Sequence, residues 1–252
     1  MEKFFTHNAE GCSIHGKLYA ENPGEVNRLV LYGHGFGGHK DNKAAARFAR
    51  HMLEKNRGTA LLCFDWPCHG DDARKKLRLE DCDAYLRLML AWAQERFDSP
   101  ELYGYATSFG GYLFLKYLSE HGNPFRKLAL RCPAVDMYAV LCSAVLDEEK
   151  RRKLERGRPV LAGFDRKLEI DGVFVESLRE ADITKRDFLD YADDLFILHG
   201  TKDELVPIAD VRAFAEDNVI DFEAVEGANH RFQDPRQMDH AVARIAAFFG
   251  MR

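Results

Sequence analysis

The sequence predicts an α/β fold in which helices cover both faces of a doubly wound, mostly parallel sheet. Short, continuously apolar runs, typical of strands buried on both faces, alternate with longer segments whose apolar residues recur at helical spacing. Glycine-rich turns follow several of the apolar runs, and the alternation is interrupted only once. Strands that alternate with helices in this way form parallel sheets. The 252 residues fit one domain of this kind.

The elements are expected in a fixed order along the chain. Two strands around the turn Glu10-Gly11 predict an antiparallel start, and Arg57-Gly58 and His121-Gly122 are stop signals for the helices before them. Asp194 opens a buried apolar run that resumes the sheet after the interruption. The expected strands are 2–8, 12–20, 28–32, 59–64, 101–107, 127–132, 194–199 and 221–225, and the expected helices are 42–56, 79–97, 112–120, 207–217 and 235–249.

Residues 136–186 interrupt the alternation and predict an inserted lid, with residues 1–135 and 187–252 forming the core of the fold. Within the lid, Asp171-Gly172 is a hairpin turn signal. The basic residues of 150–153 share a helix with acidic neighbours, which favours a solvated face over a site for an anionic substrate.

Composition excludes several classes of protein. A net charge of −5 gives no electrostatic footprint for nucleic acid or for an anionic membrane. The N-terminus has no apolar signal core and no apolar run approaches the length of a membrane span, so a cytoplasmic location is expected. The six cysteines form no CxxC pair, which favours reduced, mostly buried thiols over disulfides or a metal site.

A serine lies at a predicted turn between a strand and a helix. Ser108 follows the strand 101–107, and the small residues Ala106 and Gly110 stand two positions before and after it. This spacing fits the Gly-x-Ser-x-Gly nucleophile elbow, with alanine in place of the first glycine. Ser108 is therefore a candidate nucleophile.

A serine nucleophile requires a base and an acid, and both stand at predicted strand ends. Asp203 comes directly after the strand that ends at His199, and His230 comes directly after the last strand. The carboxyl ends of the strands meet at one crevice, and the chain order Ser, Asp, His is the one found in α/β-hydrolases. We therefore expect Ser108, Asp203 and His230 to form a catalytic triad.

The oxyanion of acyl transfer needs two N–H donors. The backbone N–H groups of Phe109, which follows the nucleophile, and of Phe36, in the glycine-rich loop 33–38, are the expected pair. In the same region we expect His34 to hold its loop through hydrogen bonds, and Asp65 and His69 to form an internal pair rather than to act in catalysis.

These motifs carry a family resemblance. The His-Gly-Phe-Gly-Gly loop, Ala-x-Ser-x-Gly-Gly, His-Gly-Thr-Lys-Asp-Glu-Leu-Val-Pro and the final Asn-His resemble the α/β-hydrolase superfamily across nearly the whole chain. The lid, with Asp165-Arg-Lys-Leu and Asp-Gly-Val-Phe-Val, resembles that of bacterial cinnamoyl (feruloyl) esterases and of serine aminopeptidase-like hydrolases. Ala106 and Cys68, which stand where glycines are usual, place the sequence off the centre of that family.

The expected function is cleavage of carboxylic esters with a hydrophobic or aromatic acyl group, without cofactor or metal. Phe36, Phe164 and Phe174 are the expected substrate-binding residues, and a small-molecule ester is the expected partner, with no nucleic acid or membrane. Thioester hydrolysis and aminopeptidase activity remain alternatives within enzymes. Outside enzymes, the alternative is a hydrolase-fold receptor that binds a small molecule without turnover. The oligomeric state, a homodimer included, stays open.

Overall fold

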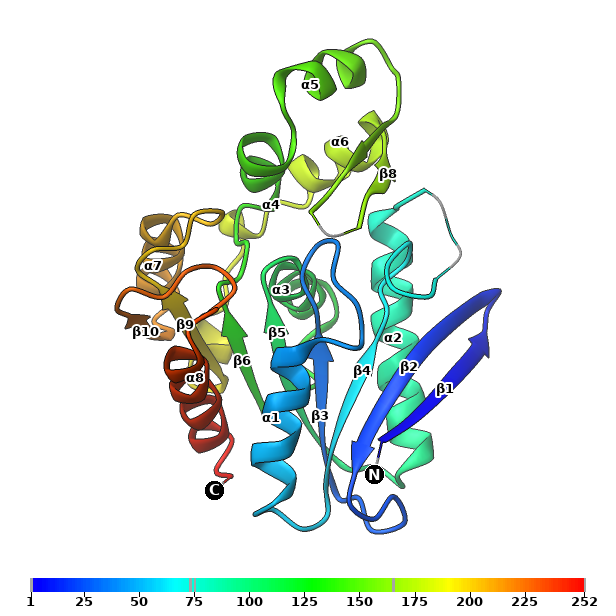
Figure 1. Cartoon of the computed structure of the whole chain (residues 1–252), viewed down its shortest axis with the longest axis vertical. Coiled ribbons are helices and arrows are strands. Elements are labelled where there is room, and N and C mark those ends of the chain that lie inside the picture. Colours follow the sequence, from blue (N-terminus) through cyan, green and yellow to red (C-terminus); the bar gives the residue numbers. More distant parts are fainter. Residues whose placement is uncertain (1, 73, 75, 165, 252) are drawn as a thin grey trace.

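A computed structural model describes residues 2–72, 74, 76–164 and 166–251 of the chain, with an eight-stranded sheet at its centre (Figure 1). The strand order is β1-β2-β4-β3-β5-β6-β9-β10. The hairpin of β1 and β2 pairs antiparallel with β4, and the other neighbours are parallel. The strands are β1 (Glu2–Ala9), β2 (Cys12–Ala20), β3 (Arg28–Gly33), β4 (Thr59–Phe64), β5 (Glu101–Thr107), β6 (Lys127–Arg131), β9 (Leu195–Gly200) and β10 (Asp221–Val225). The predicted mostly parallel α/β sheet is confirmed.

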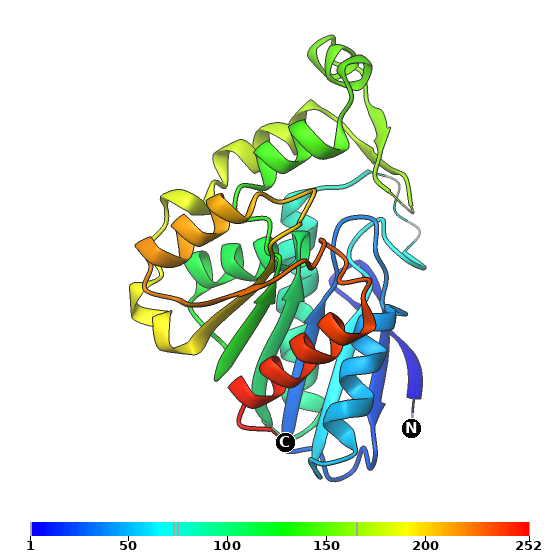
Figure 2. The same ribbon diagram turned by 60° about the vertical axis from the view of Figure 1, so that its left-hand side comes forward.

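Helices cover both faces of the sheet and define two cores (Figures 1 and 2). The first face carries α1 (Lys43–Leu53) and α8 (Pro235–Phe248), whose apolar residues pack with Tyr32 and Tyr105 of the strands. The second face carries α2 (Leu79–Arg96), α3 (Phe109–His121) and α7 (Ile208–Asp217). All six cysteines lie within the described residues and are free thiols, five of them buried, as predicted.

The segment between β6 and β9 lies above the carboxyl ends of the parallel strands (Figure 1). Its elements are α4 (Met137–Val140), a π-helical turn (Leu141–Val145), α5 (Glu148–Glu155), β7 (Val160–Ala162), β8 (Leu168–Ile170), α6 (Gly172–Glu180) and a 3₁₀ turn (Ile183–Lys185), and a second 3₁₀ turn (Leu189–Asp194) leads into β9. On α5, Lys150, Arg152 and Lys153 pair with acidic residues of the same helix, so the solvated-face interpretation is confirmed.

The expected hairpin turn at Asp171-Gly172 is wrong. Asp171 is the N-cap of α6, where its side chain accepts hydrogen bonds from the backbone N–H groups of Val173 and Phe174. The hairpin lies earlier, where β7 pairs antiparallel with β8. An aspartate before glycine suits both a turn and a helix start, because a free carboxylate satisfies the first N–H groups of a helix as well as those of a turn.

Candidate active site

Ser108 stands alone between β5 and α3 in a strained backbone conformation. Its φ of 52° and ψ of −120° lie in a region that residues with a side chain rarely adopt. The surrounding backbone holds it there. The Ser108 N–H donates to the Arg131 carbonyl at 3.1 Å, and the Ser108 carbonyl accepts from the N–H groups of Tyr112 and Ala134. Strand and helix together therefore fix the direction of the hydroxyl.

Small residues make room for this turn. A Cβ atom added to Gly110 would lie 2.4 Å from the carbonyl oxygen of Gly33, which is backbone and cannot give way. One added to Gly35 would lie 3.2 Å from the Ser108 Cβ. Ala106, which replaces the usual first glycine, is fully buried and in register with Gly33 on the neighbouring strand. The structure thus accommodates the extra methyl group.

Asp203 and His230 meet at the ends of β9 and β10. The Nδ1–H of His230 donates to Oδ2 of Asp203 at 2.8 Å. The other carboxylate oxygen accepts from the backbone N–H groups of Leu205 and Val206 at 2.9 and 2.8 Å. Nε2 of the fully buried His199 lies 3.0 Å from the carbonyl of Val206 and 3.2 Å from the same Oδ2 of Asp203. Asp203 therefore receives hydrogen bonds on both oxygens.

These contacts keep Asp203 ionised. Burial alone would raise its pKa, but the hydrogen bonds from His199 and His230, the charge of His230 and the Val206 N–H outweigh burial and lower the pKa of Asp203 well below its usual value. A charged carboxylate at Nδ1 fixes His230 in the tautomer that leaves Nε2 free to accept a proton. Cys132 lies nearby, its sulfur within 4.8 Å of the ligand atoms of both residues, but the Asp203–His230 hydrogen bond occupies these groups.

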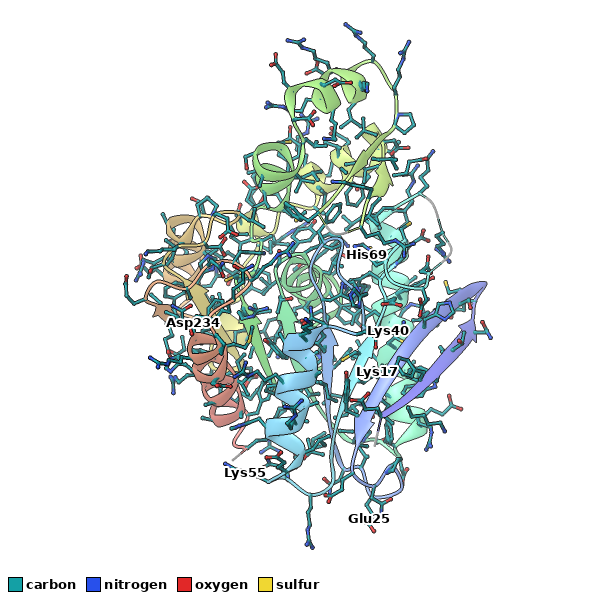
Figure 3. The ribbon with its side chains drawn as sticks, viewed as in Figure 1. Lys17, Glu25, Lys40, Lys55, His69 and Asp234 are labelled. Carbon is teal, nitrogen blue, oxygen red and sulfur yellow. The ribbon has the colours of Figure 1, made fainter. Side chains whose placement is uncertain are left out.

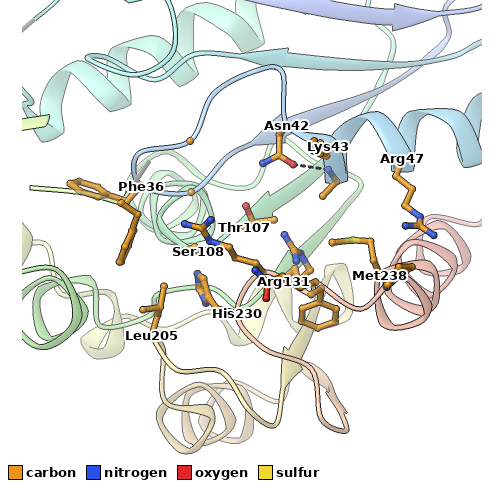
Figure 4. A pocket seen from close by; sticks show the side chains of 18 residues that line it. Phe36, Asn42, Lys43, Arg47, Thr107, Ser108, Arg131, Leu205, His230 and Met238 are labelled. Atoms are coloured by element: carbon orange, nitrogen blue, oxygen red, sulfur yellow. Dashed lines mark hydrogen bonds between the residues drawn. The ribbon is translucent and has the colours of Figure 1, made fainter. Parts of the chain in front are cut away.

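Ser108 and His230 line one pocket of about 460 Å³ (Figure 4). Phe36 reaches it from the loop after β3, Leu205 from the loop after β9, and Phe164 from the segment above the sheet. The structure thus brings the serine and the Asp203-bound histidine to one cavity.

The two predicted oxyanion donors stand beside this serine. Phe109 is the first residue of α3, and Phe36 lies in a loop closed by a hydrogen bond from the Gly38 N–H to the Gly35 carbonyl. Within the described part of the chain neither the Phe36 nor the Phe109 N–H has a hydrogen-bond acceptor. The two rings pack edge to face at 5.5 Å, which ties the loop to the start of α3.

Two buried imidazoles support the loop from behind. His34 Nδ1–H donates to the Gly35 carbonyl at 2.9 Å while its Nε2 accepts from the Trp66 N–H, so the predicted structural role of His34 is confirmed. Burial lowers the pKa of His34 to about 3, and burial together with the neighbouring His34 lowers the pKa of His69 to about 3. Both rings are therefore neutral.

The expected pair of Asp65 and His69 is wrong. Asp65 accepts from the backbone N–H and from Nζ of Lys40, at 2.7 and 2.9 Å, and from the Asp71 N–H. His69 Nδ1–H donates instead to the Pro67 carbonyl. Lys40 and His69 both lie near the carboxyl ends of the strands (Figure 3). The buried Lys40–Asp65 ion pair therefore joins the loop that carries Phe36 to the loop after β4.

Of the three phenylalanines expected to bind substrate, Phe36 and Phe164 line the pocket, and Phe164 is 36% exposed. The expectation for Phe174 is wrong, because this residue of α6 is fully buried in the core and is not among the residues that line the pocket. Arg166, in the segment between β6 and β9, donates hydrogen bonds to the carbonyls of Gly70 and Asp72 and so attaches this segment to the loop after β4. Asp165, part of the motif quoted for the lid, lies outside the described residues.

Sequence reasoning missed Arg131 and His199. His199 is the last residue but one of β9 and Arg131 is the last residue of β6, so each is a polar residue at a buried strand position. A polar residue at the carboxyl end of a buried strand was the signal, since that end faces the crevice.

Comparison with known proteins identifies a family and a fold. Residues 52–251 match the prolyl oligopeptidase family of peptidases (S9). A search of curated protein sequences finds no match. Among solved structures, Est1E from Butyrivibrio proteoclasticus with ferulic acid bound is similar, with a TM-score of 0.78 and 19% identity over 97% of both chains.

Two further structures have the same fold. The esterase domain of a Rhodothermus marinus protein aligns with 18% identity and a TM-score of 0.71, over 98% of this chain and 97% of that one. XC6422 from Xanthomonas campestris, described as a serine hydrolase without lid, aligns with 13% identity and a TM-score of 0.67, over 99% and 94%. The fold is that of the α/β-hydrolases, and the predicted resemblance to that superfamily is confirmed. No helix in the described ranges is both long and apolar enough to span a membrane.

Proposed function

The chain belongs to the prolyl oligopeptidase family of α/β serine hydrolases, and from this membership we propose that it hydrolyses carboxylic esters through Ser108, His230 and Asp203. One observation carries the proposal. A serine in a strained turn shares a pocket with a histidine whose Nδ1–H is bonded at 2.8 Å to a buried carboxylate. Such a set activates a hydroxyl that would otherwise be a poor nucleophile.

The mechanism is two-step acyl transfer. His230 Nε2 accepts the Ser108 proton as the hydroxyl attacks the ester carbonyl, and Asp203 stabilises the imidazolium. The N–H groups of Phe36 and Phe109 bind the oxyanion. His230 then protonates the leaving alcohol, which departs from an acyl-enzyme. Water, deprotonated by His230, releases the acid. No cofactor enters any step.

The acyl group is proposed to be hydrophobic, and an aromatic one of the cinnamoyl type suits the pocket. Phe36, Phe164 and Leu205 give it an apolar wall, and the similar Est1E binds ferulic acid. Thioesters would pass through the same acyl-enzyme and are the nearest alternative.

Peptide hydrolysis is the second candidate, because the family is named for peptidases. An aminopeptidase, however, must bind the substrate's terminal ammonium group, which carboxylates do best. None of the described residues that line the pocket is acidic. This favours the ester over a peptide cut from its N-terminus.

Residues 136–186 are proposed to act as a lid on a core of residues 1–135 and 187–252. Phe164 supports this, since it lies in the segment and lines the pocket. Phe164→Ala should then lower kcat/KM for an aromatic acyl ester about tenfold while hydrolysis of a small acetate ester changes little. Leu161→Ala, at an exposed position of the same segment that is not among the pocket-lining residues, is the matched control. Parallel losses on both esters would contradict the lid role.

Covalent labelling tests the nucleophile. A fluorophosphonate should modify the protein once, at Ser108, and Ser108→Ala should abolish both labelling and turnover while leaving the circular dichroism spectrum unchanged. Ser119→Ala, on the helix that follows Ser108, is the control. A panel of acetyl, cinnamoyl, thioester and aminoacyl amide substrates then ranks the activities. Labelling of another serine in Ser108→Ala, or binding of esters without any turnover, would refute the proposal.

A further inference from the structure

The lysine and arginine side chains that line the pocket beside Ser108 have no acidic counterpart among the described lining residues, although the chain as a whole is acidic. Four arginine and lysine residues line it, and no aspartate or glutamate does so within the described ranges. The whole chain has a net charge of −5. The four residues are Lys43, Arg47, Arg131 and Arg231. A single sign of charge in a concave site raises the local concentration of ligands of the opposite sign.

Arg131 is the unusual member of this set. It is only 5% exposed, and it stands directly beside the nucleophile, since its carbonyl accepts the Ser108 N–H and it is in register with Thr107. Its guanidinium lies over the ring of Phe232 at 5.1 Å, and in Figure 4 it lies between Ser108 and Met238. Nε and Nη1 are buried without a hydrogen-bond partner.

This arrangement is costly unless a ligand completes it. A buried charge without a counter-ion destabilises a fold by several kcal/mol. Arg131 takes part in no ion pair among the described residues. Its guanidinium lies near the uncharged Tyr105 hydroxyl and over the ring of Phe232 instead of beside a carboxylate. A guanidinium kept in a substrate pocket under these conditions fits a planar anion, which it can bind through two parallel hydrogen bonds.

Lys43 provides a second charge across the pocket. It is the exposed first residue of α1, and no ion pair of it occurs among the described residues, whereas Arg47 one turn later is paired with Asp239 at 2.5 Å. The first turn of α1 carries no acidic residue. The partial positive charge of the helix N-terminus therefore adds to that of the lysine.

We propose that this pocket binds a carboxylate carried by the substrate, held between Arg131 and Lys43 and located on the leaving half of the ester. The location follows from chemistry and rests on the proposed function. The leaving oxygen must approach His230 to receive its proton, and the stretch of pocket wall that begins at His230 includes Phe232, on which Arg131 packs. The enzyme would thus release an alcohol or phenol that bears an anion.

Two esters that differ in one charge test this. 4-Acetoxybenzoate and 4-acetoxybenzamide share their acyl group and shape, and only the first has an anionic leaving half. The wild type should prefer the benzoate in kcat/KM. In Arg131→Met and in Lys43→Gln the ratio of benzoate to benzamide should fall, by about tenfold for the arginine, as for loss of one charge-assisted hydrogen bond. Arg131→Lys should restore part of the ratio.

Controls separate this inference from the function itself. Arg50→Gln removes a charge from an exposed position of α1 that does not line the pocket, and its ratio should equal the wild-type ratio. Hydrolysis of the neutral benzamide that is lost in Ser108→Ala reports on the esterase proposal alone. If Arg131→Met does not fold, two other measurements test the carboxylate site. They are the ratio of benzoate to benzamide hydrolysis in Lys43→Gln and the calorimetric binding of 4-hydroxybenzoate to Ser108→Ala. A wild-type ratio at or below one, or ratios unchanged in the Arg131 and Lys43 variants, would overturn the carboxylate site.

Discussion

Replacing Ser108 by glycine should stabilise the protein relative to replacing it by alanine. Ser108 has a φ of 52° and a ψ of −120°, and three backbone hydrogen bonds hold it there. A residue with a Cβ atom in such a region costs about 1–3 kcal/mol. Alanine retains this cost, and glycine removes it.

The expected gain is the difference between two terms. Glycine loses roughly 0.5–1 kcal/mol more backbone entropy than alanine on folding. Subtracted from the strain, with both terms at the middle of their ranges, this leaves Ser108→Gly more stable than Ser108→Ala by about 1 kcal/mol. Each kcal/mol corresponds to roughly 2–4 °C in Tm for a chain of this size. Both variants lack the hydroxyl, so its own contacts cancel in the comparison.

Urea unfolding of the two variants at pH 7 measures this difference. Ser119, in the regular part of α3, provides the matched control, since its backbone is helical and both of its variants likewise lack a hydroxyl. There glycine should be less stable than alanine by about 1 kcal/mol. If Ser108→Gly were no more stable than Ser108→Ala while the Ser119 pair behaved as expected, the turn would not be strained and the argument would fail.

The other predictions concern charge. Asp203→Asn should lower kcat by roughly four orders of magnitude, because an amide no longer selects the Nδ1–H tautomer of His230, and a loss below tenfold in steady-state kinetics would point to another acid. The pKa values of His34 and His69 are lowered to about 3 in the folded state, so both rings contribute fully to the free energy of unfolding above the unfolded pKa near 6.5. As the pH drops from there towards 3, the free energy of unfolding should fall by about 1.4 kcal/mol per histidine and pH unit. Urea unfolding between pH 7 and 5 should show this slope, and a flat profile would contradict the neutral pair. Burial alone would raise the pKa of Asp171, but its hydrogen bonds to Arg78 outweigh burial and lower the pKa to about 2. The free energy of unfolding should therefore fall further between about pH 4 and 2, and Asp171→Asn should remove this second fall.

The fold could be predicted because its pattern is local. Buried strands and amphipathic helices can be recognised from the pattern of about ten residues, and the alternation of strands and helices allows few topologies. The elements within residues 136–186 could not be predicted in this way. Strands β7 and β8 have three residues each, and Asp171 caps a helix rather than turning a hairpin. Elements this short carry no periodicity, so tertiary contacts such as the bidentate Arg78–Asp171 ion pair decide their ends.

Site contacts were predictable where backbone geometry alone brings residues together. Asp203 and His230 meet because β9 and β10 are parallel neighbours and each residue follows its strand. The partner of Asp65 could not be found in this way, because Lys40 reaches it from 25 positions away through a long flexible side chain. Contacts of that kind depend on how two loops fold over one another, which no strand pattern encodes.

The residues expected to act in catalysis and the side chains that line the rest of the pocket come from different parts of the fold. Ser108, Asp203 and the Phe109 N–H are placed by strand ends and helix starts, and the fold that supplies these strands and helices is shared at 13–19% identity with TM-scores of 0.67–0.78. The groups that would contact the substrate beyond its carbonyl come from elsewhere: Phe164 from the segment above the sheet and Lys43 from the start of α1. Such side chains can change without disturbing a strand, so the lining of the pocket, rather than the shared fold, selects the substrate. The charge of this lining is therefore a better guide to the substrate than any similar structure.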